Sequence, residues 1–158
     1  MSLAGMTWEW KMNLAISDAE PCDLETILAL QKLAFRREAE LYNDFSIPPL
    51  TQTLESMRTD LSKKTFLKAC LAVTIVGSVR GFQDHSTCLV ERLAVHPDHQ
   101  NRGIGTALMC ALEGRFPNAR RFELFTGHKS EGNIRLYQRL GYAVFKQEGM
   151  LVFMAKTK

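Results

Sequence analysis

The sequence predicts a single α/β domain with a mixed β-sheet flanked by helices. Segments with strand-like alternation occur on both sides of segments with helical periodicity, and 158 residues suffice for one ordinary core. Hydrophobic residues make up 46% and charged residues 23%, as in globular proteins. No linker or repeat divides the chain, so we expect one domain over 1–158. The start, where a second methionine follows at Met6, is consistent with an expression scar.

The N-terminal half begins with a strand and two helices. Residues 11–17 alternate apolar and polar side chains, which predicts an opening strand. Asp23 is a plausible N-cap for a helix whose apolar residues recur at helical spacing to about Leu41. The segment 42–49 should end this helix, because its two prolines lack amide donors and disfavour helix before them. A second helix is expected over 51–61.

The remainder alternates strands and helices, with glycine, proline and short polar turns between them. The pattern predicts strands at about 65–73, 75–83, 87–95, 121–126, 143–148 and 150–156, and helices at about 105–114 and 132–140.

A glycine turn between the strand ending at Val95 and the next helix is suited to a pyrophosphate. Gly103 and Gly105 let the backbone approach a ligand without a Cβ, and the first amides of a helix supply donors and a positive dipole end. Two other phosphate loops do not fit. A dinucleotide fingerprint needs a third glycine where Leu108 stands, and the chain has no Walker sequence.

The segment 93–109, with its pattern Gln-x-x-Gly-x-Gly, resembles motif A of the GNAT superfamily of N-acetyltransferases. The segment 130–142 resembles motif B, with Asn133 and Tyr137 at the family's spacing. The resemblance covers the C-terminal half closely and the whole chain loosely. It implies the GNAT acyl-CoA N-acyltransferase fold, with the order βααβββαβαββ. It also implies transfer of an acetyl group from acetyl-CoA to a primary amine by direct attack in a ternary complex.

The resemblance assigns the residues that bind acetyl-CoA. The pantetheine arm pairs with the backbone at the end of the motif A strand, the turn holds the pyrophosphate, and motif B meets the pantetheine side and the sulfur. The expected cofactor-binding residues are Leu93, Ala94, Val95, Gln100, Asn101, Arg102, Gly103, Ile104, Gly105, Thr106, Asn133 and Tyr137.

Two catalytic roles follow. The Tyr137 hydroxyl is expected to protonate the departing thiolate. An alkylammonium of pKa about 10.4 is neutral at pH 7 in only about one molecule in 2,500, so the amine needs a base or a desolvating site. Glu91 is the first candidate base, because it lies two residues before Leu93 and strand alternation predicts that both side chains share a face. Glu123 on the facing strand is the alternative, and Cys88 keeps a covalent acetyl-enzyme open.

Acceptor recognition is expected between the first helix and the second strand, where carboxylates and aromatics could hold a cationic amine. The alternative is an ordinary helix surface and packed loop. The candidates are Glu38, Glu40, Tyr42, Asn43, Asp44 and Phe45. The acceptor is expected to be a small molecule, with a protein or peptide acetyltransferase and a non-catalytic acyl-CoA-binding domain as the alternatives. A homodimer is compatible with the resemblance.

Composition argues against other partners. The net charge is only +3 and the basic pairs are scattered, which gives no case for nucleic acid. The four cysteines lack metal-ligand spacing, and we interpret them as reduced thiols of a cytoplasmic protein. No segment is apolar enough to cross a membrane. The four histidines fall in separate loops and turns, so no metal is expected.

Overall fold

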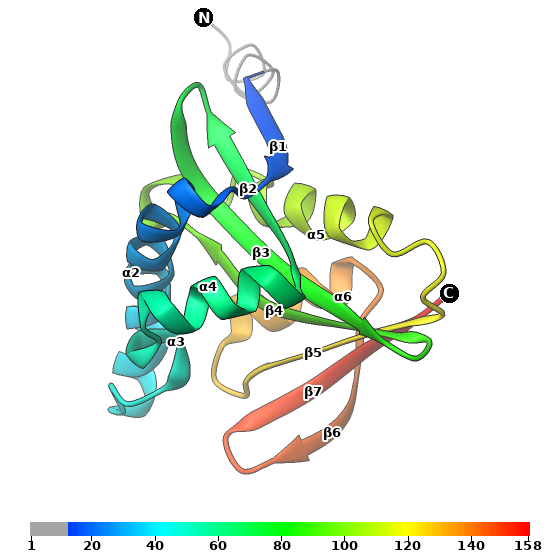
Figure 1. The fold of residues 1–158 in the computed structure, drawn as a ribbon. Helices are drawn as coiled ribbons and strands as arrows, with labels where there is room; N and C mark the ends of the chain where they lie inside the picture. The colour runs from blue at the N-terminus through cyan, green and yellow to red at the C-terminus, as the bar shows by residue number, and fades with distance from the viewer. Residues whose placement is uncertain (1–12) are drawn as a thin grey trace, which may run out of the picture.

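The computed structural model describes residues 13–158, which form a seven-stranded sheet with helices on both faces (Figure 1). The strand order is β1-β2-β3-β4-β5-β7-β6. Neighbouring strands are antiparallel except for β4 and β5, which run parallel. The mixed α/β sheet predicted from the sequence is therefore confirmed. No helix among these residues is long and apolar enough to cross a membrane.

The elements follow the predicted order, with the short helix α3 and two 3-10 helices, η1 and η2, in addition. They are β1 (Leu14–Asp18), η1 (Pro21–Asp23), α2 (Leu24–Tyr42), α3 (Pro48–Thr51), α4 (Leu54–Lys63), β2 (Thr65–Leu71), β3 (Thr74–Asp84), β4 (Thr87–Val95), η2 (Pro97–His99), α5 (Ile104–Gly114), β5 (Arg121–Gly127), α6 (Glu131–Arg139), β6 (Ala143–Glu148) and β7 (Leu151–Thr157). Residues 11 and 12 of the expected opening strand lie outside the described residues.

The additional helix α3 begins at the two prolines that were expected only to interrupt helix. Helix α2 does end at Tyr42, with Asn43 in the left-handed conformation (φ 49°). Pro48 and Pro49 then occupy the first turn of α3, where a helix needs no amide donor. Because proline lacks an amide donor, it disfavours helix before it and yet suits the first turn of a new helix.

Each face of the sheet carries its own apolar cluster. On the face towards the viewer in Figure 1, Leu24 and Ile27 of α2 pack with Met57 of α4 and Phe66 of β2. On the other face α5 and α6 cover a larger cluster, to which Leu108, Leu112 and Tyr137 belong. Both helix layers cover the sheet around β3 and β4, so these strands are buried on two sides.

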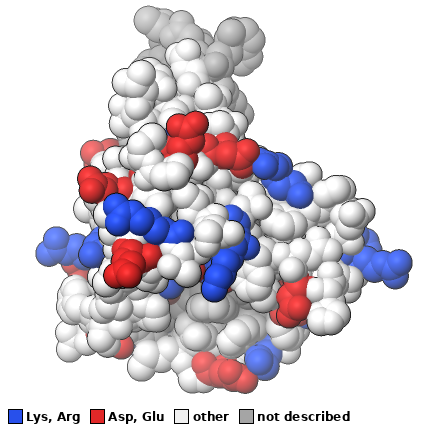
Figure 2. Space-filling view, viewed as in Figure 1, with Lys and Arg blue, Asp and Glu red and all other residues white. Residues whose placement is uncertain are grey.

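Charged side chains are dispersed over the face of the molecule shown in Figure 2. On the face shown in Figure 2, cations and anions alternate with uncharged surface, and neither sign forms a continuous stripe.

Helix α5 lies unusually close to β3 at Gly77. A Cβ built there would be 2.9 Å from Leu108 Cδ1 and 3.1 Å from Ile104 Cγ2. We expect Gly77→Ala to lower the free energy of unfolding by about 1–3 kcal/mol through overpacking, measured by urea denaturation. Gly114→Ala is the control, because a Cβ there meets nothing within 4 Å and alanine favours helix. Equal stability of the two variants would contradict the close approach.

Candidate active site

The turn between β4 and α5 leaves the N-terminus of α5 open. Gly103 is the N-cap, with φ at +83° in the left-handed region, and Asn101 also has a positive φ of 63°. No side chain caps the helix, so its first amides have no partner from the N-cap residue. Gln100 folds back, and its Nε2 donates to the Val95 carbonyl at 3.4 Å. The exposed segment 100–103 thus presents free amide donors and the Arg102 charge together.

The two glycines of this turn have different roles. A Cβ on Gly103 would meet nothing within 4 Å, so the space beside it is open to a ligand. A Cβ on Gly105 would instead lie 3.3 Å from Leu136 of α6 and 3.7 Å from Leu93 of β4. The ligand approach expected at both positions is therefore supported by the geometry at Gly103, while glycine at 105 allows α5 to pack against α6 and β4.

Strands β4 and β5 pair over a short stretch only. Thr87, Cys88 and Leu89 of β4 lie opposite Arg121, Phe122 and Glu123 of β5, and the described pairing stops there. Beyond it β5 continues to pair with β7, and β4 continues to pair with β3. Residues 90–95 of β4 therefore have one edge without a strand partner, next to the turn at Gly103.

A β-bulge at Arg92 changes the direction of the side chains on β4. Val79 of β3 faces two residues of β4, Arg92 and Leu93, because the register shifts between Ser78↔Ala94 and Arg80↔Glu91. Arg92 has a φ of 55°, which is rare for a residue with a side chain.

The expected shared face of Glu91 and Leu93 is wrong. Leu93 packs with the cluster beneath α5, whereas the Glu91 carboxylate lies on the other face and accepts from Lys64 Nζ at 3.0 and 3.2 Å. Strand alternation failed here because the extra residue of the bulge shifts the period of two by one position.

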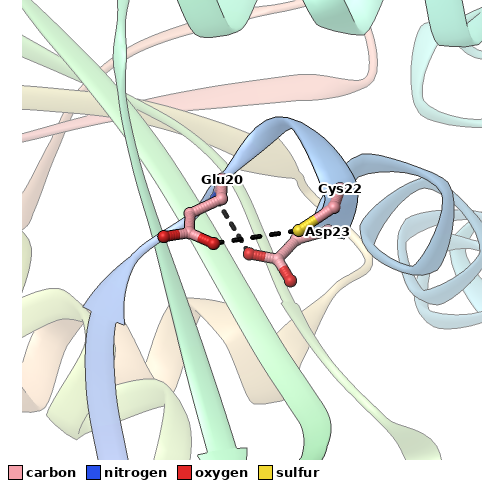
Figure 3. A group of neighbouring side chains, drawn as sticks. All are labelled: Glu20, Cys22 and Asp23. Carbon is pink, nitrogen blue, oxygen red and sulfur yellow. Dashed lines mark hydrogen bonds between the residues drawn. The ribbon is translucent and has the colours of Figure 1, made fainter.

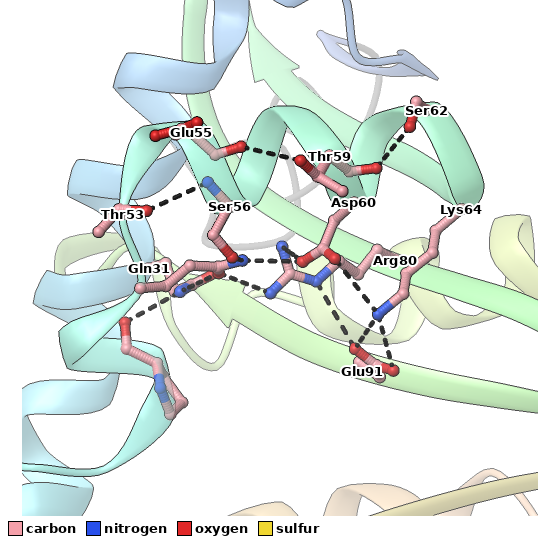
Figure 4. Close-up of polar contacts among 12 residues, drawn as sticks. Gln31, Thr53, Glu55, Ser56, Thr59, Asp60, Ser62, Lys64, Arg80 and Glu91 are labelled. Carbon is pink, nitrogen blue, oxygen red and sulfur yellow. Dashed lines mark hydrogen bonds and ion pairs between the residues drawn. The ribbon is translucent and has the colours of Figure 1, made fainter.

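Glu91 belongs to a polar network under α4 (Figure 4). Arg80 of β3, only 2% exposed, donates to Gln52 Oε1 at 2.9 Å, and Gln52 also accepts from Gln31. Asp60 and Glu91 each lie 3.8 Å from the Arg80 guanidinium. Burial lowers the pKa of Arg80 to about 10, with nearby Arg92 acting in the same direction and the carboxylates opposing it. Arg80 therefore remains cationic at neutral pH.

Tyr137 lies on α6 in the cluster beneath the sheet. Its ring packs against Tyr142, with centroids 6.1 Å apart, and the side chain is buried. Burial raises the pKa of the Tyr137 hydroxyl above its usual range, and the Glu38 carboxylate of α2 adds to the effect. Helix α6 lies beside the stretch where β4 and β5 have separated, because Asn133 of this helix contacts Thr126 of β5 beyond the paired residues. The Tyr137 phenol keeps its proton throughout the physiological range.

Asn133, one turn before Tyr137, is exposed, and its Nδ2 lies 3.5 Å from Thr126 Oγ1 of β5.

Two of the expected acceptor residues on α2 are anchored to the loop before α6. Glu38 Oε1 accepts from the Gly127 amide at 3.1 Å and from Ser130 Oγ at 3.3 Å. The Tyr42 hydroxyl accepts from the Lys129 amide at 2.8 Å. Asp44 folds onto Ser46, whose amide and hydroxyl both donate to it, and Phe45 is 54% exposed. Glu38 and Tyr42 therefore hold structure together, while Phe45 is available at the surface.

The remaining catalytic candidates have distinct environments. Glu123 on β5 accepts from Arg121 Nε at 2.7 Å and is partly exposed. Cys88 is fully buried, and burial together with Glu113 raises the pKa of its thiol to about 12. A thiol in this state is a poor nucleophile, which argues against a covalent acetyl-enzyme at Cys88.

One group of potential metal ligands lies close together, at Glu20, Cys22 and Asp23 (Figure 3). Its side chains have structural partners. Asp23 accepts from the Glu20 amide at 2.8 Å, in the capping box of η1, and from Lys68 Nζ at 2.7 Å. These contacts account for the group without an ion.

Sequence reasoning did not identify Lys64, Arg80 and Arg92 as part of the site. Two arginines within otherwise apolar strands were the available signal, because buried charges rarely occur without a specific partner. Their convergence depends on the bulge at Arg92. The sequence gives no sign of this bulge, because the residue with the positive φ is an arginine and not a glycine.

The structure brings three features together: an open helix N-terminus, a strand pair that separates beside it, and a buried tyrosine on the next helix. The acetyltransferase (GNAT) family model matches residues 25–142, and the chain belongs to this family.

Relatives share parts of the chain. "UPF0157 protein YqkA" of Bacillus subtilis (strain 168) is 26% identical over 116 residues, which are 73% of this chain and 33% of that protein. "Acetyltransferase SG1711" of Sodalis glossinidius (strain morsitans) is 33% identical over 79 residues, 49% of this chain and 56% of that protein. The chain thus spans less than two thirds of either relative.

Solved structures share the fold. The PaiA N-acetyltransferase of Thermoplasma acidophilum, in complex with coenzyme A, has a TM-score of 0.82 at 16% identity, covering 92% of this chain and 99% of that one. The ribosomal-protein-S18-alanine N-acetyltransferase of Escherichia coli has a TM-score of 0.73 at 16% identity, with 91% and 93% coverage. At such identities the likeness establishes the architecture alone.

The protonation state of the Cys88 thiol can be tested by alkylation. At pH 8 a thiol of pKa about 12 has only about one molecule in 10,000 as thiolate, so iodoacetamide should leave Cys88 unmodified in the native protein. The exposed Cys22 and Cys110 serve as internal controls and should be alkylated. Peptide mapping by mass spectrometry reads all three. Alkylation of native Cys88, or an acetyl adduct on it after incubation with acetyl-CoA, would contradict this assignment.

Proposed function

We propose that the protein transfers the acetyl group of acetyl-CoA to the primary amine of a small molecule, by direct attack in a ternary complex. The observation that carries this proposal is the open N-terminus of α5 at Gly103, next to the unpaired edge of β4. A pyrophosphate fits free amides, a positive helix end and a position where no Cβ intervenes. An extended pantetheine arm fits an unpaired strand edge, because its amides can pair with the backbone.

The proposed cofactor contacts follow these two features. Gln100, Asn101, Arg102, Gly103, Ile104, Gly105 and Thr106 would surround the pyrophosphate, and Leu93, Ala94 and Val95 would pair with pantetheine. Asn133 would contact the pantetheine side. Acetyl-CoA supplies an activated thioester when bound, and the protein's contribution is to hold it and to move protons.

Tyr137 is the proposed acid. Its buried hydroxyl retains its proton, and the helix that carries it lies beside the separation of β4 and β5, so we assign to it the protonation of a thiolate departing there. The amine approaches from the face of α2 and α4, because α5 and α6 occupy the other face.

Glu91 remains the first proposed base, since its carboxylate lies on this acceptor face. Lys64 already donates to both of its oxygens, so a proton must be accepted in competition with that ion pair or through water. Glu123 is the alternative, held by Arg121 in a similar way.

One surface feature favours a polypeptide acceptor as the second candidate. Phe125 of β5 and Phe145 of β6 are 51% and 47% exposed, and both rings lie beside Phe153 of β7. Helices α2 and α4 do not cover this part of the sheet in Figure 1. A flat apolar surface of this kind suits an extended peptide better than an enclosed pocket would.

The function is tested by CoA release from acetyl-CoA with a panel of small amines, amino acids, aminoglycosides and peptides. Turnover of small amines supports the proposal. Exclusive turnover of peptides supports the second candidate, and tight acetyl-CoA binding without turnover of any acceptor indicates a binding domain.

Gly103→Ala should weaken acetyl-CoA binding at least tenfold in calorimetry, because its Cβ enters the space assigned to the pyrophosphate. Gly149→Ala is the matched control, with φ of +57° and no atom within 4 Å of its Cβ, in the turn between β6 and β7. The free energy of unfolding should fall by about 1 kcal/mol in both variants, because alanine is strained at a positive φ. Equal acetyl-CoA affinities would place the pyrophosphate elsewhere.

Tyr137→Phe should lower kcat about ten- to a thousandfold while acetyl-CoA affinity and stability change little. Tyr142→Phe is the control, because its hydroxyl donates to Glu113 away from the proposed site and its loss should affect stability rather than turnover. Rates are compared at saturating substrates. A parent-like kcat for Tyr137→Phe would leave Tyr137 as a packing residue.

Glu91→Gln should remove most of the turnover at pH 7–8 and leave acetyl-CoA affinity intact, because an amide cannot accept the amine's proton. Glu123→Gln, measured in parallel, should retain most of the activity. The reverse result would transfer the role of base to β5.

A further inference from the structure

Two arginine side chains converge on a narrow recess on the acceptor face. Arg80 comes from β3 and Arg92 from the bulge of β4. Ile27 and Gln31 of α2, with Phe66 of β2 and Ser78 of β3, complete most of the lining. We call this the arginine recess. Arg80 is buried, while Arg92 is half-buried and is the one nearer to solvent.

Both guanidinium groups have donors without acceptors. The Nε atoms of Arg80 and Arg92 are buried and have no hydrogen-bond partner among the described residues. The terminal nitrogens of Arg80 are engaged, one with Gln52 and one near Asp60. In residues 13–158 no hydrogen bond or ion pair joins Arg92 to another side chain, which is unusual for a half-buried guanidinium.

The ionised groups around the recess do not balance. Lys64, Arg80 and Arg92 are cations, and the two carboxylates facing them belong to Asp60 and Glu91. One positive charge is left over where burial already disfavours charge, as the lowered pKa of both arginines shows. An uncompensated buried cation is costly, and one further anion would restore neutrality.

We propose that the acceptor is a small amine carrying a carboxylate, and that Arg92 binds this carboxylate at the mouth of the arginine recess, with Arg80 behind it. This inference rests on the proposed function. A guanidinium matches a planar carboxylate through paired N–H donors.

The position of Arg92 connects the recess to the reaction. Arg92 lies between Glu91, the proposed base, and Leu93, where pantetheine is proposed to pair. The bulge places the side chains of Glu91 and Arg92 on the same face of the sheet. An acceptor whose amine and carboxylate are a few bonds apart, as in an amino acid, would then place its amine near the Glu91 carboxylate and its carboxylate near the Arg92 guanidinium.

The test compares amines that differ only in the carboxylate. Suitable pairs are L-alanine with ethylamine, L-phenylalanine with 2-phenylethylamine, and L-lysine with cadaverine. We expect kcat/KM for the carboxylated member of at least one pair to exceed that of its partner tenfold or more. Arg92→Gln should reduce this ratio at least tenfold, and Arg92→Lys, which keeps the charge but loses the paired donors, should reduce it less.

Arg115→Gln is the control for loss of a cation. Arg115 is exposed on the far side of the fold from the recess and pairs with Asp18, so this variant should keep the parental ratio. Circular dichroism and thermal unfolding verify that each variant is folded. No preference for carboxylated amines, or the same preference in Arg92→Gln as in the parent, overturns the inference.

A binding measurement separates this inference from the proposed function. L-alanine, L-phenylalanine and L-lysine are titrated by calorimetry into the protein saturated with CoA, for the parent and for Arg92→Gln. Binding that depends on Arg92 without turnover of any amine supports the carboxylate site and contradicts the proposed function. Turnover of amines with no Arg92-dependent binding supports the function and contradicts the site.

Discussion

The separation of β4 from β5 is the constraint on which the rest of the molecule depends. Two parallel strands in the middle of a sheet normally share hydrogen bonds along their length, yet here the pairing ends at Leu89 and Glu123. Each strand keeps its outer neighbour, so the sheet remains one body while its centre opens. Backbone groups that a sheet would ordinarily pair therefore lack a strand partner along this edge of β4, including those of the apolar residues Leu93 and Val95.

The helices on the two faces of the sheet place different groups beside the gap between β4 and β5. Below it, α5 supplies an uncapped N-terminus and α6 supplies a tyrosine whose burial holds its proton. Above it, α2 and α4 surround a polar network in which Arg80 is completely enclosed. The ion pairs between Lys64 and Glu91 are partly buried, with side chains 19% and 26% exposed, so water screens them less than it screens fully exposed pairs. The same low polarity that strengthens them also makes an unmatched charge, such as that of Arg92, expensive to leave alone.

Local chemistry was sufficient to predict most of the elements and the glycine turn between β4 and α5 from the sequence. Glycine at 103, the apolar periodicity of α5 and the strand before it are short-range features, and the structure agrees with them. The orientation of Glu91 was beyond such reasoning, because it depends on one extra residue in β4 at a position occupied by arginine rather than glycine. The packing role of Gly105 and the partners of Arg80 likewise depend on α6, α2 and α4, which approach from distant parts of the chain. The site's backbone could thus be anticipated, while its electrostatics could not.

The anchoring of α2 to the loop before α6 has a mechanical consequence. Glu38 and Tyr42 hold the amides of Gly127 and Lys129, and this loop leads directly into the helix that carries Tyr137. Gly127 leaves no room for a Cβ against Tyr42 and Glu38, so the contact is close. Helix α2 also borders the face from which an acceptor would arrive. A displacement of α2 would therefore be transmitted through these two hydrogen bonds to the loop before α6, and so to the helix that carries Tyr137.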